Sequence, residues 1–139
     1  MIIEGDQRMA TEALQSLIQQ AAESWRTGDA ATFANLFADD GELIVPGQRW
    51  LGVTAIKQAA QTFADSHERV KIVIHQMVFE RQYAVVEWTW EDTETSTGKT
   101  TQADDIIMIT FVHGQIQRWR EYIDTETPRT KAVQPVLST

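Results

Sequence analysis

The spacing of apolar residues changes once along this chain, and this change does most to limit its fold. Before residue 64 these residues recur at helical intervals, whereas from residue 70 onward they alternate along extended runs. The short links between the runs require antiparallel pairing, because parallel strands need a long crossover. Helices followed by such a meander predict an α+β fold. The four expected strands cover residues 70–80, 83–92, 100–112 and 115–124.

The first helix is predicted from one apolar stripe between Thr11, a suitable N-cap, and Gly28, a common type of helix stop. At 139 residues the chain is expected to form one domain. That domain is predicted over residues 11–124, with residues 1–10 as an N-terminal extension and 125–139 as an exposed C-terminal tail. The stripe consists of Leu14, Leu17, Ile18, Ala21, Ala22 and Trp25.

Two more helices are expected before the long strands. Asp29 is placed to cap a short second helix that carries Phe37 and ends at Asp39-Asp40-Gly41. A short strand over residues 42–45 follows. Helical spacing then returns and predicts a third helix over residues 53–66.

Composition excludes several classes of function. There are 12 Lys and Arg residues against 20 Asp and Glu residues, a net charge of −8, which argues against nucleic acid or an anionic membrane as a partner. No apolar run is long enough to span a membrane and no signal peptide opens the sequence, so a cytoplasmic location is expected. The absence of cysteine excludes disulfides, thiolate metal sites and a cysteine nucleophile.

The strand expected over residues 100–112 is apolar on both faces through its middle. Helices can cover one face of the sheet, so the second face needs another cover. The simplest one is a second copy of the chain, which predicts a homodimer through the outer sheet face. One face carries Asp105, Ile107, Ile109 and Phe111, and the other carries Asp104, Ile106, Met108, Thr110 and Val112.

Several short motifs follow one another in a recognisable order along residues 10–124. They are Gly28-Asp29, Leu36-Phe37-Ala38-Asp39-Asp40-Gly41, Gly52 with Ile56, and Gly114 with Ile116 leading into Trp119-Arg120-Glu121-Tyr122-Ile123-Asp124. This order resembles the nuclear transport factor 2-like superfamily, and within it the SnoaL-like group of polyketide-cyclase and ketosteroid-isomerase relatives. The resemblance implies a cone, in which a curved antiparallel sheet packs on three N-terminal helices around an apolar pocket. Members include enzymes and non-catalytic binding modules, so the fold alone does not give the function.

The comparison with ketosteroid isomerases argues against their usual mechanism here. The position of their general-base aspartate is taken by Val45, and that of their oxyanion-hole tyrosine by Ala21. Their second oxyanion-hole group, an aspartic acid, falls on Asp104 or Asp105. The resemblance therefore implies a pocket of the same kind with different chemistry in it.

Two carboxylates are the candidate catalytic residues. The resemblance turns the face of the last strand that carries Trp119, Glu121 and Ile123 toward the pocket. Asp105 on the neighbouring strand can share that face, with Asp104 as the alternative if the register shifts by one residue. Two carboxyls in a dry cavity push their pKa values apart, which suits an acid and a base. The alternative is that Glu121 pairs with an arginine or a backbone donor and is purely structural.

Aromatic residues are expected to converge on the interior. As a group they suggest walls for a flat apolar ligand, and the alternative is that each simply packs in the core. The predicted ligand-binding residues are Trp25, Phe37, Trp50, Phe63, Trp88, Trp90, Trp119 and Ile123.

The histidines point to no metal site or cofactor. His75 lies on a strand, His113 in a hairpin turn and His67 in a helix-to-strand loop, without the spacing of a metal-binding motif. No phosphate loop, dinucleotide fingerprint or nucleophile elbow is present, so no cofactor is expected.

Three hypotheses remain from the sequence. The first is an enzyme that binds an apolar or aromatic small molecule and catalyses isomerisation, cyclisation or dehydration by acid–base chemistry. The second is a non-catalytic ligand-binding module with the same pocket, and the third is an interaction module that uses its outer sheet face.

Overall fold

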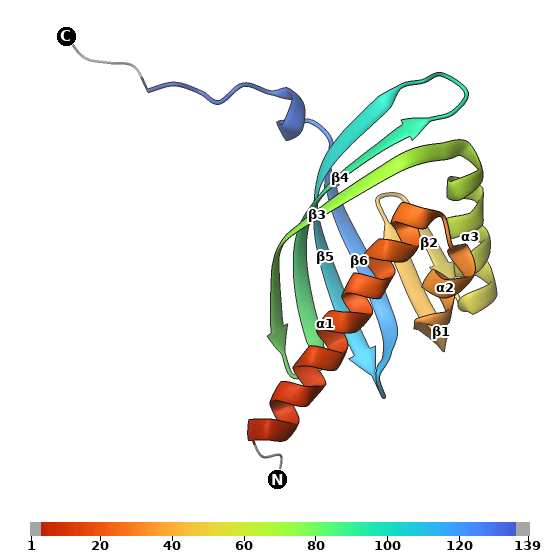
Figure 1. Ribbon diagram of the computed structural model, residues 1–139, viewed down its shortest axis with the longest axis vertical. Helices are drawn as coiled ribbons and strands as arrows, with labels where there is room; N and C mark the ends of the chain where they lie inside the picture. Colours follow the sequence, from red (N-terminus) through yellow and green to blue (C-terminus); the bar gives the residue numbers. More distant parts are fainter. Residues whose placement is uncertain (1–3, 136–139) are drawn as a thin grey trace.

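The structure, a computed structural model, describes residues 4–135 and consists of helices packed on one side of a strongly curved sheet (Figure 1). The helices are α1 (Glu4–Thr27), α2 (Ala30–Asn35) and α3 (Val53–Ser66), with a short 3-10 helix, η1 (Thr127–Arg129), after the last strand. The strands are β1 (Phe37–Val45), β2 (Gln48–Leu51), β3 (His67–Glu80), β4 (Tyr83–Glu94), β5 (Thr100–Val112) and β6 (Gln115–Asp124).

The strands form one six-stranded sheet in the order β2-β1-β6-β5-β4-β3. The antiparallel meander of β3 to β6 is confirmed, and so is the α+β class with three N-terminal helices. The sheet as a whole is mixed, because β1 runs parallel to β6. This pairing joins the N-terminal half of the chain to the last strand and completes the curve of the sheet over the helices.

The predicted start of the first helix at Thr11 is wrong, since α1 begins at Glu4 and takes in most of the expected extension. Residues 4–10 contain no proline, and five of the seven are good helix formers (Glu4, Gln7, Arg8, Met9 and Ala10), so nothing in this stretch stops the helix at Thr11. The predicted end at Gly28 is confirmed, because this glycine has a φ of +72° directly after α1.

The predicted end of the second helix is also wrong. α2 ends at Asn35, and Phe37 with Asp39-Asp40-Gly41 belongs to β1. Here pairing with β6 overrides the local turn signal, and the register shifts between Phe37 and Glu42. Gly41 permits this close approach, because a Cβ atom there would lie 2.9 Å from the carbonyl oxygen of Ala38 and 3.1 Å from that of Ile116.

Two strand boundaries differ from the sequence analysis. β2 was not expected, because it has only four residues and follows the Pro46-Gly47 turn. β3 begins at His67, three residues before the expected strand, so His67 lies in a strand and not in a loop. The two tight hairpin turns are confirmed, with φ values of +54° at Arg81 and +51° at His113.

The core fills one end of the cone. Side chains of α1, α2 and the middle of β4, β5 and β6 meet there, and Trp88 and Trp119 are completely buried. Aromatic rings pack edge to face within it, as in the pair Phe33 and Trp119 with centroids 5.5 Å apart. The other end of the cone is less completely filled.

Candidate functional site

A cavity of about 730 Å³ lies at the less filled end of the cone, between α3, the β1–β2 hairpin and the concave face of the sheet. Its size suits a small organic molecule. Its walls are made largely of apolar and aromatic side chains with a few polar groups. The lining comprises Trp25, Leu43, Val45, Gln48, Trp50, Ala55, Gln58, Ala59, Thr62, Phe63, Ser66, His67, Trp90, Asp92, Thr101, Ala103, Asp105, Glu121, Ile123 and Thr125.

The structure places both candidate carboxyls in this lining. Asp105 pairs with Ile123 across β5 and β6, and Ile107 pairs with Glu121 two residues further along. Asp105 and Glu121 are therefore diagonal neighbours on one face of the sheet. The alternative register is wrong, because strand alternation turns Asp104 to the outer face, where it is exposed.

Asp105 is buried and only half satisfied. It is 3% exposed, and its Oδ2 accepts a hydrogen bond of 3.0 Å from Nε1 of Trp88, directly opposite on β4. Its Oδ1 has no hydrogen-bond partner in the described part of the chain. Burial raises the pKa of Asp105 to about 6, partly offset by the Trp88 hydrogen bond, and the neighbouring charge of Asp104 adds to the rise.

Glu121 is half-buried and more strongly perturbed. Burial raises its pKa to about 8, and the charge of Asp105 raises it further, while the nearby indole N–H of Trp119 opposes the shift. Trp119 Nε1 does not meet the geometry of a hydrogen bond to any residue in the described range. The pair thus titrates in two steps, because ionised Asp105 makes the ionisation of Glu121 harder.

At neutral pH this order of ionisation leaves one of the two carboxyls ionised and the other protonated. Asp105, with a pKa of about 6, is mainly ionised and can accept a proton. Glu121, with a pKa of about 8, is mainly protonated and can donate one. A general acid and a general base on one wall of a cavity are the groups needed to transfer protons to and from a bound molecule.

The predicted ligand-binding residues divide into two groups. The structure brings Trp25, Trp50, Phe63, Trp90 and Ile123 to the cavity. The remaining three do not line it: Phe37, Trp88 and Trp119 are buried in the core at the other end of the cone.

Their placement has a simple physical reason. The rings of Phe33 and Phe37 lie against Trp119, and Trp88 packs on Trp119 with centroids 5.8 Å apart, which leaves no room for a ligand between them. Trp88 still contributes indirectly, because its indole N–H holds Asp105. Of the two positions that distinguish the chain from ketosteroid isomerases, Val45 lines the cavity and Ala21 is buried in α1.

Asp92 is an acidic residue of the cavity that was not predicted from the sequence. It is 7% exposed, and its Oδ2 accepts a hydrogen bond of 2.6 Å from Nε1 of Trp90. Trp88, Trp90 and Asp92 follow one another at every second residue of β4, so they share a face. Had the alternation that placed Trp88 and Trp90 inward been extended by two residues, it would have included Asp92.

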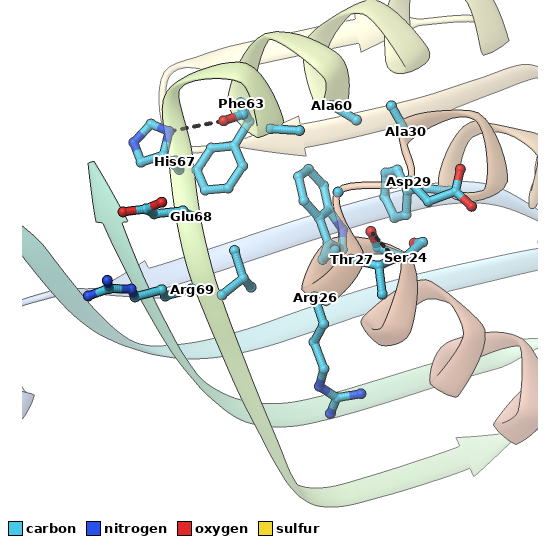
Figure 2. A pocket seen from close by; sticks show the side chains of 15 residues that line it. Ser24, Arg26, Thr27, Asp29, Ala30, Ala60, Phe63, His67, Glu68 and Arg69 are labelled. Atoms are coloured by element: carbon cyan, nitrogen blue, oxygen red, sulfur yellow. Dashed lines mark hydrogen bonds between the residues drawn. The ribbon is translucent and has the colours of Figure 1, made fainter. Parts of the chain in front are cut away.

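A second, smaller cavity of about 260 Å³ lies where α1 and α3 end and β3 begins (Figure 2). Two of its charged groups are already engaged: Asp29 accepts hydrogen bonds from the backbone N–H and the hydroxyl of Thr32, and Arg26 donates to the carbonyl oxygen of Ile72. His67 stacks on Phe63 with ring centroids 4.1 Å apart. Trp25 and Phe63 line both cavities and lie between them.

The other histidines lie outside both cavities. His75 is exposed on the outer sheet face, where its Nε2 lies 2.6 Å from the hydroxyl of Thr89, and His113 is exposed in its hairpin. Within residues 4–135, no three His, Asp or Glu side chains are grouped so that they could hold a metal ion. None of the helices in this range is both long and apolar enough to cross a membrane.

The SnoaL-like domain family matches residues 18–119. This chain belongs to that family. No curated protein shows a significant match to the chain. The expectation drawn from the short motifs is thus confirmed at the level of the family and its fold.

Solved structures of very different sequence share the fold. A protein of ketosteroid isomerase-like fold from Catenulispora acidiphila, in complex with trimethylamine, is 15% identical with a TM-score of 0.72, covering 76% of this chain and 83% of that one. A polyketide cyclase candidate from Xanthomonas campestris is 20% identical with a TM-score of 0.69, covering 81% and 91%. An epoxide hydrolase from M. tuberculosis is 18% identical with a TM-score of 0.71, covering 82% and 84%. At such identities the likeness establishes the fold alone.

Proposed function

We propose that this protein binds a small, largely apolar molecule in the large cavity and catalyses proton transfer on it. The observation that carries the proposal is the pairing of Asp105 and Glu121 on one wall of an aromatic-lined cavity. The similar structures named as a polyketide cyclase candidate and an epoxide hydrolase are consistent with small-molecule chemistry in this fold.

The chemistry follows from the two protonation states. Ionised Asp105 removes a proton from a carbon atom next to a carbonyl group, while protonated Glu121 donates its proton to the carbonyl oxygen. The product is an enol. Asp105 then returns a proton to the same or another carbon atom while the enol hydroxyl returns its proton to Glu121, which completes an isomerisation or, if Asp105 has exchanged its proton with the solvent, an exchange. Apolar walls favour this pairing, because they keep Glu121 protonated at neutral pH.

The test is hydrogen–deuterium exchange at the α-carbon atoms of 2-tetralone, a flat enolisable ketone, followed by NMR in D₂O near neutral pD. The wild-type protein is expected to accelerate the exchange, and Glu121→Gln to reduce the acceleration about 100-fold, since one proton-transfer group is removed. Glu12→Gln, which changes an exposed carboxyl of α1 away from the cavity, is the matched control and should leave the rate unchanged.

The alternative function is a non-catalytic binding module with the same cavity. The hydrogen bond that ties Asp105 to Trp88 favours it, because a carboxylate held in this way can serve structure alone. In that case 2-tetralone binds, as seen by shifts of the tryptophan indole resonances, but its exchange in the presence of wild-type protein does not exceed the rate in buffer. That result would reject the catalytic proposal and retain the binding one.

We also propose that two copies of the chain pair through the outer sheet face. Exposed apolar side chains of neighbouring strands gather there, namely Val78, Tyr83, Ile106, Met108, Val112 and Tyr122. Met108→Glu places a charge in the middle of this face and is expected to convert a dimer into a monomer, measured by light scattering after size-exclusion chromatography. A wild-type protein that is already monomeric would contradict the proposal.

A further inference from the structure

The ionisable side chains that line the large cavity are mostly acidic. Asp92 of β4, Asp105 of β5 and Glu121 of β6 contribute three carboxyl groups from three adjacent strands. Among the described residues that line the cavity there is no lysine or arginine, and His67 of β3 is the only side chain that can become cationic. The cavity thus favours a positively charged occupant and disfavours an anion.

The carboxyl groups retain capacity to bind a ligand. Only 3% of the surface of Asp105 is exposed, and its Oδ1 has no hydrogen-bond partner among the described residues. The ion pairs within the described residues involve other acids, namely Glu23, Glu42, Glu91 and Glu126. A buried carboxylate without a compensating cation is costly, so a ligand that supplies the cation gains from the exchange.

The aromatic walls suit the same kind of ligand. Trp25, Phe63 and Trp90 pack edge to face with ring centroids 5.6–5.7 Å apart, and Trp50 joins the lining from β2. The faces of tryptophan rings are the strongest cation–π partners among protein side chains. A neutral apolar molecule would use these walls but would leave Oδ1 of Asp105 without a partner.

We propose that the cavity binds a small organic cation, in which a protonated or quaternary amine is attached to an apolar body. The amine lies against Asp105 and Glu121, and the apolar body lies against the aromatic walls. This inference rests on the binding part of the function proposed above and names its class of ligand. With such a cation bound, both carboxyls are ionised and act as its counter-ions, so the proton-donor role of Glu121 applies to a neutral ketone only.

Binding of such a cation has a signature in proton balance. A positive charge beside the pair favours the ionised carboxyls, so it lowers the pKa of both Asp105 and Glu121. Glu121, with a pKa of about 8 in the empty cavity, then loses a proton when the ligand binds at pH 7. The affinity for the cation is expected to rise between pH 6 and pH 8, since protonated Glu121 is progressively lost. His67 and Asp92 are the other titratable groups of the lining. Asp105 and Glu121 also line a neighbouring hollow, whose other charged groups are Arg120, Asp104, Glu87 and Asp124.

The experiment compares two ligands of the same size by isothermal titration calorimetry at pH 7. The 2-phenylethylammonium ion is expected to bind at least about tenfold more tightly than neutral 2-phenylethanol. Titrations in two buffers of different ionisation enthalpy should show net release of protons with the cation and none with the alcohol.

Variants of the two carboxyls test whether they cause the preference for the cation. Asp105→Asn and Glu121→Gln should each weaken binding of the cation about tenfold or more, and change binding of the alcohol by less than about threefold, because each removes a charge and keeps the shape. Glu12→Gln, which changes an exposed carboxyl of α1 away from the cavity, is the control and should change neither. Circular dichroism of each variant checks that it is folded.

Each contrary result has its own meaning. If the alcohol binds as tightly as the cation, or if both charge-removing variants bind the cation as the wild type does, the cationic ligand is rejected while a cavity for neutral molecules stands. If the cation, the alcohol and 2-tetralone all fail to bind, the proposed function itself is rejected together with this inference.

Discussion

The two ends of the cone use aromatic residues in opposite ways. At the closed end Phe33, Phe37, Trp88 and Trp119 are at most 2% exposed and pack on one another. At the open end Trp25, Trp50, Phe63 and Trp90 are only partly buried and surround a cavity of about 730 Å³. Similar residues, as Trp88 and Trp90 on β4 illustrate, thus form a solid core or a binding wall, according to whether other side chains fill the space before them.

This difference in packing indicates which aromatic residues stabilise the fold and which are available to bind a ligand. A completely buried ring contributes through close packing, whereas a ring on a cavity wall has part of its surface free for a ligand. Asp105 lies at the border, because it lines the cavity while Trp88 of the closed end donates a hydrogen bond to one of its oxygen atoms. Changes at the two ends should therefore be separable by experiment.

The largest effect is expected at the closed end. Trp119→Ala removes a completely buried indole and should lower the free energy of unfolding by about 3–5 kcal/mol, measured by urea denaturation. Should this variant fail to fold, Trp119→Phe tests the same point with a smaller cavity. A loss below about 1 kcal/mol for both would contradict the division into two ends, because it is the loss expected of a surface residue.

A smaller effect, dependent on pH, is expected at the border. The pKa of Glu121 is raised from 4.5 to about 8 on folding, so the folded protein holds this proton more tightly than the unfolded chain. Stability from this group is therefore fully present below pH 4.5 and is lost as pH rises toward 8.

The measurement is the free energy of unfolding at pH 5 and at pH 8. The wild type should lose about 1–3 kcal/mol more than Glu121→Gln over this interval. Glu12→Gln should behave like the wild type, since this carboxyl is exposed on α1. Parallel curves for wild type and Glu121→Gln would show that Glu121 titrates normally.

The smallest effect on stability is expected at the open end. Trp50→Ala removes a partly buried ring of β2 that lines the cavity, and should lower the free energy of unfolding by no more than about 1 kcal/mol. The same variant should weaken binding of 2-phenylethylammonium or 2-tetralone about tenfold, measured by calorimetry. A large loss of stability with unchanged binding would place Trp50 with the core.

Much of the fold could be predicted from sequence because its signals are local. Alternation along β4 and β5 and the tight turns at Arg81 and His113 fixed the meander, and the same alternation turned Asp105 and Glu121 to one face once the direction of that face was taken from the resemblance. The error at Asp39-Asp40-Gly41 has the opposite origin. Those residues read locally as a turn, but β1 pairs with a strand that follows it by more than 70 residues, and such pairing leaves no local mark.

The division of the aromatic residues could not be predicted for a related reason. Periodicity tells which face of a strand a ring occupies, but not whether another element fills the space before it. Trp88 and Trp90 share a face and differ by two positions, yet only Trp90 lines the cavity. That outcome depends on where α1, α2 and α3 cross the sheet, which is a property of the assembled fold.

The chain of neighbouring indoles has a practical consequence. Trp25, Trp90, Trp88 and Trp119 follow one another with ring centroids no more than 6.4 Å apart, and two of them donate to carboxylates that face the cavity. Excitation energy can transfer between neighbouring indoles. A ligand beside Trp90 is therefore expected to change the fluorescence of all four tryptophans. The intrinsic tryptophan fluorescence of the protein can thus be used to screen candidate ligands without a label.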